Sequence, residues 1–415
     1  MTLWSGRVGG SLDPAVWEFL RADDRELLPY DCEATAEHAG RLHAAGLLTH
    51  DELDEVERRL REIAIDPVAY LDSDEDVHSA IERLLGPVGR KIHAGRSRND
   101  QVAAAVRLYV VDACAEAREG IEALALVTLS FAEAEAETLM PGYTHLQRGQ
   151  PITVGHHLLA WVEMLERDRT RFAAAAAAAS ESPLGSGALA GSTLGLDPPV
   201  GQMRNSLDAV SDRDFALDYL YAAAVLYTHL SRIGEEIVLW ASAEFGFVKL
   251  PETAATGSSM MPQKLNPDVA ELVRGKAGTA IGRLAGLLAT VKGLPLAYDR
   301  DLQEDKGPVF GARRDVRLGL AALTSLVSGL AVDPERLSAA AADPLLLATD
   351  AAEELVRGGI PFRDAHERIA ESVLDGSYTP MGTAADSVVA RGAPGPGGVV
   401  DAITAARRRF GQGRP

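Results

Sequence analysis

Long helical periodicity is the feature that most restricts how this chain can fold. Between residues 211 and 240 the apolar side chains recur every three to five positions, which places them on one face of a helix. They are Phe215, Leu220, Ala223, Leu226, Leu230, Ile233, Ile237 and Trp240. Ser211 is expected to cap the start, with Asp214 three residues on. A helix of about 30 residues runs about 45 Å, which is long for a globular protein and favours a helix bundle.

Two further segments, residues 100–137 and 150–180, predict long helices of the same kind. Alternation of β-branched residues is scarce, so we expect an all-α fold. The alanine run 173–179 predicts a helix with a thin face that lets a neighbour approach closely. A chain of 415 residues exceeds what one hydrophobic core normally holds, so two or three domains are expected. A boundary near residues 335–345 precedes a smaller helical segment.

Charge and cysteine content exclude several classes of protein. The net charge of −19 disfavours a nucleic-acid binder, although a local basic pocket for a small anion is compatible with it. The sequence contains neither a basic amphipathic helix nor an apolar run of about 20 residues, so nothing in it indicates a membrane protein. Cys32 and Cys114 form no CxxC pattern, so we expect neither a zinc site nor a disulfide framework, and a reducing cytoplasm fits. The start "MTLWSGRVGG" predicts no signal peptide.

Polar loops rich in Gly and Pro interrupt the predicted helices. Loops that a rigid scaffold holds are where binding and catalytic residues concentrate. The loops are "GRSRND" (95–100), "MPGYTHLQRGQP" (140–151), "SPLGSGALAGSTLGLDPPVGQ" (182–202), "TGSSMMPQKLNPD" (256–268) and "KGLPLAYDRDLQEDKGP" (292–308).

The loop 256–268 combines a mobile hydroxyl-bearing segment with a predicted helix start. Asn266 is a favoured N-cap residue and Pro267 a favoured first residue, so we expect a helix from Asn266. Lys264 and Asn266 would lie where free N–H groups and the helix dipole favour an anion. Ser258 precedes them on a flexible arm and becomes an effective base only if its proton is made easier to remove. The alternative is a plain connector before a well-capped helix.

Three other loops carry hydrogen-bonding side chains. Thr144 and His145 lie in a polar cluster, and histidine is the side chain best suited to move a proton near neutral pH. "GRSRNDQ" is expected to bind a carboxylate at a helix entrance, and "DLQEDK" behind Tyr298 suits a zwitterionic or cationic group. The alternatives are an exposed histidine, a solvated helix start and a solvated charged turn. Together these groups suit a dicarboxylate substrate with a polar leaving group, and no metal signature is present.

Six motifs in order resemble the argininosuccinate lyase family, and "GSSMMPQKLNP" resembles the signature of its fumarase/aspartase superfamily. The resemblance runs from "LWSGR" at residue 3 to about residue 375. The motifs are "EDVHSAIE" (75–82), "GRSRNDQV" (95–102), "GYTHLQRGQP" (142–151), "NSLDAVSDRDF" (205–215), "LPLAYDRDLQEDK" (294–306) and "ATDAAEELVRGGIPFRDAHE" (348–367).

The resemblance implies an all-α fold of three helical domains, here at residues 1–97, 98–340 and 341–415. Long central helices would form a 20-helix bundle in a homotetramer, and three chains would contribute to each active site. The implied reaction is the reversible anti-elimination of L-argininosuccinate to L-arginine and fumarate, a step of arginine biosynthesis in the cytoplasm. It implies no metal or organic cofactor, and no nucleic-acid or membrane partner.

The resemblance also implies roles for individual residues. Ser258 would be the base and His145, directly or through water, the acid, although the family pattern alone allows the opposite order. Lys264 would stabilise the doubly negative aci-carboxylate intermediate, and Glu271 would pair with the histidine. The substrate-binding residues implied are Asn99, Thr144 and Asn266 for the fumarate half; Arg98, Tyr298, Gln303 and Lys306 for the amine half; and Arg213 and His78 near the site.

Departures from the family pattern gather where the amine half would bind. Leu265, Asp299 and Gly307 stand where the family usually has Lys, Asn and Glu, and Ala94 replaces a common Thr. The family's Phe-Asn-x-Ser substrate-contact stretch has no counterpart here. This chain reads "EFLRADDREL" (18–27), which is shorter than the corresponding region of the family and lacks the contacting Ser. Two alternatives follow: a fumarate-releasing lyase for another N-substituted aspartate, and a catalytically silent structural member of the fold. The intact set of proposed catalytic residues argues against the second.

Overall fold

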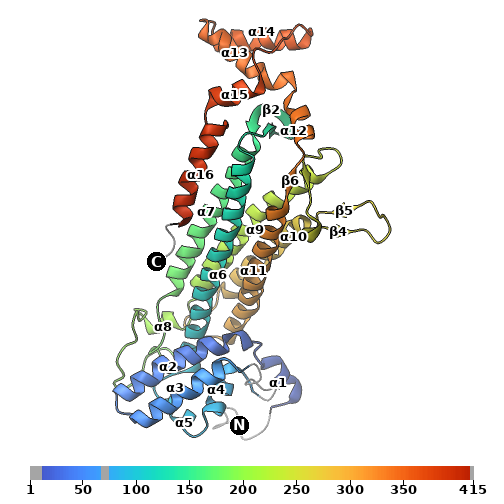
Figure 1. The fold of residues 1–415 in the computed structure, drawn as a ribbon. Coiled ribbons are helices and arrows are strands. Elements are labelled where there is room, and N and C mark those ends of the chain that lie inside the picture. The colour runs from blue at the N-terminus through green and yellow to red at the C-terminus, as the bar shows by residue number, and fades with distance from the viewer. Residues whose placement is uncertain (1–11, 67–73, 412–415) are drawn as a thin grey trace. The chain divides into compact units, whose positions relative to one another are not determined.

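The structure is a computed structural model that describes residues 12–66 and 74–411 (Figure 1). Helices dominate the described chain, which confirms the expected all-α class. The α-helices are α1 (Pro14–Leu20), α2 (Leu28–Ala44), α3 (His50–Ala64), α4 (Val77–Leu85), α5 (Gly89–Ile92), α6 (Arg98–Ala134), α7 (Val154–Ala179), α8 (Ser206–Ala209), α9 (Asp214–Ala241), α10 (Asp268–Val291), α11 (Lys306–Gly329), α12 (Pro334–Ala341), α13 (Ala348–Arg357), α14 (Phe362–Leu374), α15 (Ala384–Arg391) and α16 (Pro396–Gly411).

Short 3₁₀ helices and small antiparallel strand pairs connect these helices. The 3₁₀ helices are η1 (Arg25–Leu27), η2 (Glu252–Ala254), η3 (Arg300–Asp305) and η4 (Pro344–Leu347). The strand pairs are β1 (Leu139–Thr144) with β2 (Gln147–Thr153), β3 (Val248–Lys249) with β6 (Ala331–Val332), and β4 (Thr256–Gly257) with β5 (Leu265–Asn266).

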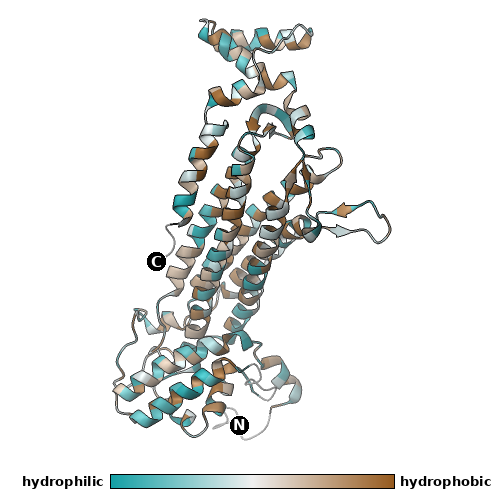
Figure 2. Ribbon diagram, viewed as in Figure 1, coloured by the Kyte–Doolittle hydropathy of each residue, from teal (hydrophilic) through white to brown (hydrophobic). Residues whose placement is uncertain are grey.

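The long predicted helices are present as α6, α7 and α9, and the alanine run 173–179 lies within α7. Figure 2 shows hydrophobic and hydrophilic residues alternating along them, as expected of helices with one buried face. Two predicted helix starts are wrong by a few residues. α9 begins at Asp214, where Asp212 instead of Ser211 accepts the first N–H. α10 begins at Asp268, because Asn266 is paired with Thr256 in the β4–β5 ladder.

The segment 140–151, expected to be a loop, forms most of the β1–β2 hairpin. Leu139 pairs with Thr153 at its base and Thr144 with Gln147 at its tip, with a register shift between Pro141 and Tyr143. The two residues at the tip, His145 and Leu146, both have φ of +56°. This is the left-handed conformation that two-residue hairpin turns require, although Asn-Gly is the usual sequence there.

The described chain divides into two compact units. Of the described residues, unit 1 comprises 12–66, 74–118, 171–224 and 279–316, and unit 2 comprises 119–170, 225–278 and 317–411. In unit 1, α2, α3 and α4 pack against one another around Leu42, Val56 and Ile81, which are fully buried. A capping box holds the start of α3, because Thr49 and Glu52 each accept the backbone N–H of the other.

Unit 2 has an aromatic and polar core between α7 and α9. The rings of Trp161 and Trp240 stack with centroids 5.6 Å apart. The Glu236 carboxylate accepts from Trp161 Nε1 at 2.5 Å and pairs with His157 Nε2 at 2.9 Å. His157 therefore packs within the helix layer. Further along the chain, α12 packs on β1, η4 on β2, and α13 on α14.

Gly234 lets α9 approach α10 within unit 2. A Cβ at this position would lie 2.5 Å from the backbone oxygen of Ala270, which is fully buried. We expect Gly234→Ala to lower the free energy of unfolding by about 1–3 kcal/mol, because backbone must move to admit the methyl group. The matched control is Gly40→Ala in α2, where a Cβ would meet nothing within 4 Å. That change is expected to be neutral or stabilising by roughly 0.5–1 kcal/mol. Urea unfolding of both variants would check this, and equal midpoints would contradict it.

None of the helices in the described ranges is both long and apolar enough to cross a membrane.

Candidate active site

In unit 1, the predicted site residue His78 forms a buried pair with a carboxylate, Asp31. His78 Nδ1 lies 2.8 Å from Asp31 Oδ2, and both side chains are at most 2% exposed. Gln101 Nε2 donates to both Asp31 oxygens at 3.0 and 2.9 Å, and Thr35 adds a longer bond. Burial by itself would raise the Asp31 pKa, but His78, Arg96 and Gln101 lower it to about 2. Asp31 is therefore ionised at neutral pH, and it orients the imidazole of His78.

Asp24 is a second buried carboxyl group beside this pair. It accepts the Val77 N–H at 3.2 Å and is 1% exposed. Burial raises its pKa to about 6, the charge of Asp76 adds to the rise, and His78 and Lys306 oppose it. His78, Asp76 and Lys306 thus converge on Asp24, although the sequence separates them widely.

Asp24 is expected to make stability depend on pH. Its pKa of about 6 in the folded protein exceeds its usual value of 3.8, so the folded state holds this proton more tightly. The stabilisation that protonated Asp24 contributes to the folded state is full below pH 3.8 and is lost as the pH rises through 6. The loss in the free energy of unfolding is up to roughly 3 kcal/mol. Urea unfolding across this range should show a stability decline that Asp24→Asn reduces but does not abolish, because burial also raises the pKa of Asp100 to about 6. The control Asp23→Asn, at the exposed neighbouring carboxylate, should keep the decline, and a wild-type slope in Asp24→Asn would contradict the account.

A buried ion cluster joins the residue that precedes α9 to η3 and α11 within unit 1. Arg213 Nε donates to Asp305 Oδ2 at 2.5 Å, and Lys306 Nζ donates to Asp305 Oδ1 at 2.7 Å. All three side chains are at most 5% exposed. Burial by itself would raise the Asp305 pKa, but Lys306 and Arg213 hold it below its usual value. Asp305 therefore fixes two of the predicted site residues with a single carboxylate.

Arg98 and Asn99 lie at the start of α6, as predicted. Arg98 pairs with Asp76 at 3.3 Å and donates to Ser79 Oγ at 3.2 Å, which connects it to the start of α4. Asn99 Nδ2 donates to the carbonyl of Ala188 at 3.1 Å in the glycine-rich loop 182–202. Asp100 accepts the N–H groups of Ser97 and Gly187, so the loop and the helix start are held together.

Tyr298 and Gln303 are the remaining predicted site residues that lie in unit 1. Burial raises the Tyr298 pKa, so its hydroxyl stays protonated as a donor. Gln303 Nε2 lies 3.4 Å from the carbonyl oxygens of both Leu20 and Arg21. The shortened N-terminal stretch thus lies against the amide that was expected to contact the amine half. Arg300 donates to the same Leu20 carbonyl at 2.7 Å.

In unit 2, Thr144 and His145 are exposed at the tip of the β1–β2 hairpin. The left-handed backbone of His145 is uncommon for a residue other than glycine and costs on the order of 1 kcal/mol or more. Such conformations persist where the surrounding structure fixes them, here the paired strands below the turn. The imidazole of His145 is therefore attached to a two-residue turn whose position the paired strands β1 and β2 define.

Ser258 lies on the arm between β4 and β5, which leads away from the start of α10 (Figure 1). Its Oγ accepts the N–H of Met261 at 2.9 Å and of Met260 at 3.3 Å. Two N–H donors aimed at one hydroxyl oxygen favour its anionic form. Thr256 Oγ1 donates to Asp268 and ties the base of the arm to α10.

Lys264, Asn266 and Glu271 follow on the same arm and on the first turn of α10. Lys264 and Glu271 are exposed and Asn266 is half-buried. The helix start lies just beyond Asn266, so its free N–H groups and positive dipole end adjoin this part of the arm.

The structure thus brings the predicted residues together in two groups. One group, buried or half-buried, lies in unit 1, and the other, exposed or half-buried, lies in unit 2. In the described part of one chain, no hydrogen bond joins His145 to Glu271, so their predicted pairing stays a prediction. Within residues 12–66 and 74–411, no three His, Cys, Asp or Glu side chains gather as a group that could hold a metal ion.

Two residues that hold the site were not singled out from the sequence: Asp24 and Asp31. Each is a buried carboxylate with a partner distant in the sequence, Val77 for Asp24 and His78 for Asp31, so no local spacing reveals it. Asp305 lies in the predicted "DLQEDK" loop, but its ion pair with Arg213, 92 positions away, was not predicted.

Two family descriptions match the chain. The family described as "Lyase" matches residues 23–282, and the family described as "Argininosuccinate lyase C-terminal" matches residues 345–379.

Relatives and solved structures are similar to this chain over most of its length. An argininosuccinate lyase from Frankia casuarinae is 52% identical over 392 residues, which cover 90% of this chain and 84% of that protein. One from Desulforudis audaxviator is 46% identical, covering 90% of this chain and 85% of that protein. The structure of an EDDS lyase variant with bound fumarate superposes with a TM-score of 0.78 at 25% identity, covering 97% of this chain and 91% of that one. A class II fumarase from Schistosoma mansoni shares the fold, with a TM-score of 0.74 at 14% identity, covering 94% of this chain and 92% of that one.

Proposed function

This chain belongs to the argininosuccinate lyase family of the fumarase/aspartase superfamily, and on that premise we propose that it splits L-argininosuccinate into L-arginine and fumarate. The reaction is a reversible anti-elimination. One structural observation carries the proposal most directly: the Ser258 hydroxyl receives two backbone N–H groups on an arm that leads into the start of α10.

The chemistry demands a strong stabiliser of negative charge. The proton to be removed lies on the carbon next to the carbon that bears the departing nitrogen, and it is far too weak an acid to leave unaided. Ser258 Oγ, in the deprotonated form that its two N–H donors favour, takes this proton and becomes the neutral hydroxyl. The electrons of the broken bond move into the neighbouring carboxylate, which then carries two negative charges. Lys264, Asn266 and the positive end of α10 stabilise that aci-carboxylate.

The second step breaks the carbon–nitrogen bond. The electron pair of the aci-carboxylate returns to form the double bond of fumarate, and the nitrogen leaves with the bonding pair. His145, directly or through water, gives the nitrogen a proton, and Glu271 holds the imidazole in position. Thr144 and Asn99 bind the fumarate half together with Asn266.

The unit 1 residues are proposed to bind the amine half. Arg98, Tyr298, Gln303 and Lys306 provide donors, and Arg213 and His78 complete the surroundings. Support comes from the rigid way these side chains are held: Lys306 and Arg213 share Asp305, and His78 is fixed by Asp31. A preset arrangement of this kind lowers the entropic cost of binding.

A homotetramer with sites shared among three chains is part of the proposal. Ser258 is only half-buried, and His145 and Lys264 are exposed in one chain, which supports their completion by other chains. α10 also leaves large apolar side chains exposed, Leu272 at 61% and Ile281 at 53% among them. Exposed apolar surface of this kind is typical of protein–protein interfaces. We further propose the three-domain division at residues 97/98 and 340/341, and a cytoplasmic location.

A product assay on a panel of N-substituted aspartates tests this function. With argininosuccinate, the purified protein should release fumarate, seen as a rise in its ultraviolet absorbance, together with one arginine per fumarate. The second candidate is a lyase for another N-substituted aspartate, which the contact of Gln303 with residues 20 and 21 favours. Turnover of another member of the panel, without turnover of argininosuccinate, would select this candidate. If the protein released fumarate from no member of the panel, both candidate functions would be refuted.

A further inference from the structure

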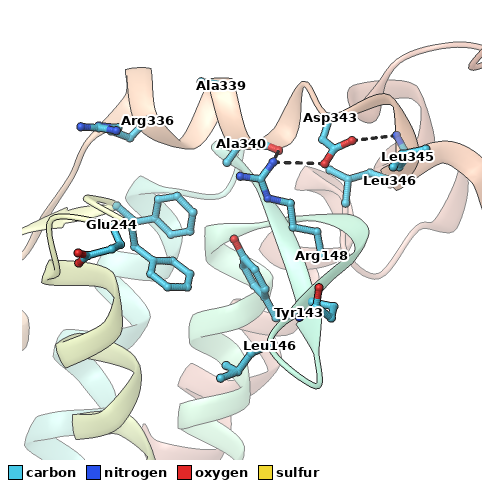
Figure 3. A pocket seen from close by; sticks show the side chains of 13 residues that line it. Tyr143, Leu146, Arg148, Glu244, Arg336, Ala339, Ala340, Asp343, Leu345 and Leu346 are labelled. Carbon is cyan, nitrogen blue, oxygen red and sulfur yellow. Dashed lines mark hydrogen bonds and ion pairs between the residues drawn. The ribbon is translucent and has the colours of Figure 1, made fainter.

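A cavity of about 590 Å³ opens in unit 2 beside the β1–β2 hairpin (Figure 3). Its walls come from the hairpin, the segment after α9, and α12 with η4. The volume lies within the roughly 300–1,000 Å³ typical of small-molecule sites. Neither Thr144 nor His145 lines the cavity, so it is separate from the residues proposed for catalysis.

Three aromatic rings form an apolar floor. The ring centroids of Tyr143 and Phe245 are 5.8 Å apart, and those of Phe245 and Phe247 are 5.3 Å apart. Leu146 and Leu345, which are 67% and 51% exposed, extend the apolar surface. Such a floor suits an apolar or aromatic side chain, which would gain both burial and ring packing there.

Two pairs of opposite charges border this floor. Arg148 lies 3.3 Å from Asp343 and 3.5 Å from the carbonyl oxygen of Ala340, so this pair is already matched. Arg336 and Glu244 lie on the other side of the cavity in the view of Figure 3. Across the ranges that the structure describes, neither of these two side chains has a hydrogen-bond or ion-pair partner.

We propose that this cavity binds a free α-amino acid whose side chain is uncharged and apolar. The ligand carboxylate meets Arg336, its ammonium meets Glu244, and its side chain lies on Tyr143, Phe245 and Phe247. The charges that line the cavity, two arginines and two acids, sum to zero. A net-neutral zwitterion therefore matches them, whereas a dicarboxylate or a net cation would leave charge uncompensated.

The site goes beyond the proposed lyase reaction, because it needs neither the succinyl group nor the amine half of that substrate. It does adjoin the catalytic hairpin. Leu146, which lines the cavity, is the second residue of the left-handed turn whose first residue is His145. A ligand that packs on Leu146 therefore contacts the turn that carries the His145 imidazole. We expect binding of such a ligand to change the rate of fumarate release.

Calorimetric titration of the full-length protein with L-phenylalanine and L-leucine tests the site. We expect saturable binding at one site per chain, and a loss of affinity of about tenfold or more in Glu244→Gln and in Arg336→Gln. Both side chains are exposed, so circular dichroism should show unchanged folding. The matched control Glu335→Gln, an exposed acid next to Arg336 on α12 but outside the cavity, should bind as the wild type does.

Truncated probes separate the two charged contacts. Phenethylamine lacks the carboxylate, so its weaker binding should not fall further in Arg336→Gln. 3-Phenylpropionate lacks the ammonium, so its binding should not fall further in Glu244→Gln. Saturating succinate, which carries the chemistry of the fumarate half, should leave phenylalanine binding in place.

Four results would overturn the proposal. They are no saturable binding of either apolar amino acid, equal affinity in wild type and both variants, binding of arginine alone, and displacement of phenylalanine by succinate. None of these results bears on fumarate release from argininosuccinate, so a failure here is distinguishable from a failure of the proposed function.

Discussion

Replacing Ser258 by alanine is expected to lower kcat by about 10²–10⁴-fold, because the elimination would lose its base. KM should change little, since Lys264, Asn266 and the helix start still bind the carboxylate. The Ser258 hydroxyl only accepts from Met260 and Met261 in an exposed arm, so folding should be unaffected. Initial rates of fumarate release over a range of argininosuccinate concentrations would measure both constants.

Ser259→Ala is the matched control for this variant. Ser259 is the next residue on the same arm and is exposed, yet the Met260 and Met261 N–H groups point to Ser258 Oγ. This control should keep nearly all of the wild-type kcat. If Ser258→Ala kept most of its activity, or both serine variants lost it equally, Ser258 would not be the base.

Replacing Asp305 by alanine is expected to have the largest effect on stability, a loss of about 3–5 kcal/mol. The change leaves the Arg213 guanidinium and the Lys306 ammonium buried without the carboxylate that both now contact at 2.5 and 2.7 Å. Two like charges would then face each other away from water. Urea unfolding followed by circular dichroism would measure the loss, and residual lyase activity should also fall because Lys306 would move.

Asp301→Ala gives the comparison for this prediction. Asp301 lies in the same 3₁₀ helix, η3, but is exposed. Its removal should change the free energy of unfolding by no more than about 0.5 kcal/mol. A wild-type midpoint in Asp305→Ala would mean that the buried cations find water or other partners, and that the cluster does not hold this part of unit 1 together.

The sequence predicted the helices well because their signal is local. The apolar spacing from Phe215 to Trp240 identified α9, and similar patterns identified α6 and α7. The hairpin was missed because its turn is His145–Leu146, which lacks the glycine or asparagine that normally marks a left-handed turn. The start of α10 was placed too early because strand pairing of Asn266 with Thr256 prevailed over its N-cap preference.

Residues of the candidate site could be predicted from the sequence only where they belong to a recognisable motif. Ser258, His145 and Lys306 stand in recognisable loops, whereas Asp31, which fixes His78 in unit 1, does not. Asp31 meets His78 and Gln101 across 47 and 70 positions, and such contacts arise from tertiary packing alone. The contact of Gln303 with residues 20 and 21 likewise needed the folded chain, although the shortened N-terminal stretch had indicated a change there.

The central claim is that the Ser258 arm of one chain and the His145 turn of another complete a single elimination site. Mixing inactive Ser258→Ala with inactive His145→Asn tests it, after subunit exchange that native mass spectrometry confirms. The account predicts that the mixed tetramers regain a substantial part of wild-type fumarate release, because some sites receive an intact serine and an intact histidine from different chains. Hetero-tetramers that form but stay as inactive as their parents would contradict it.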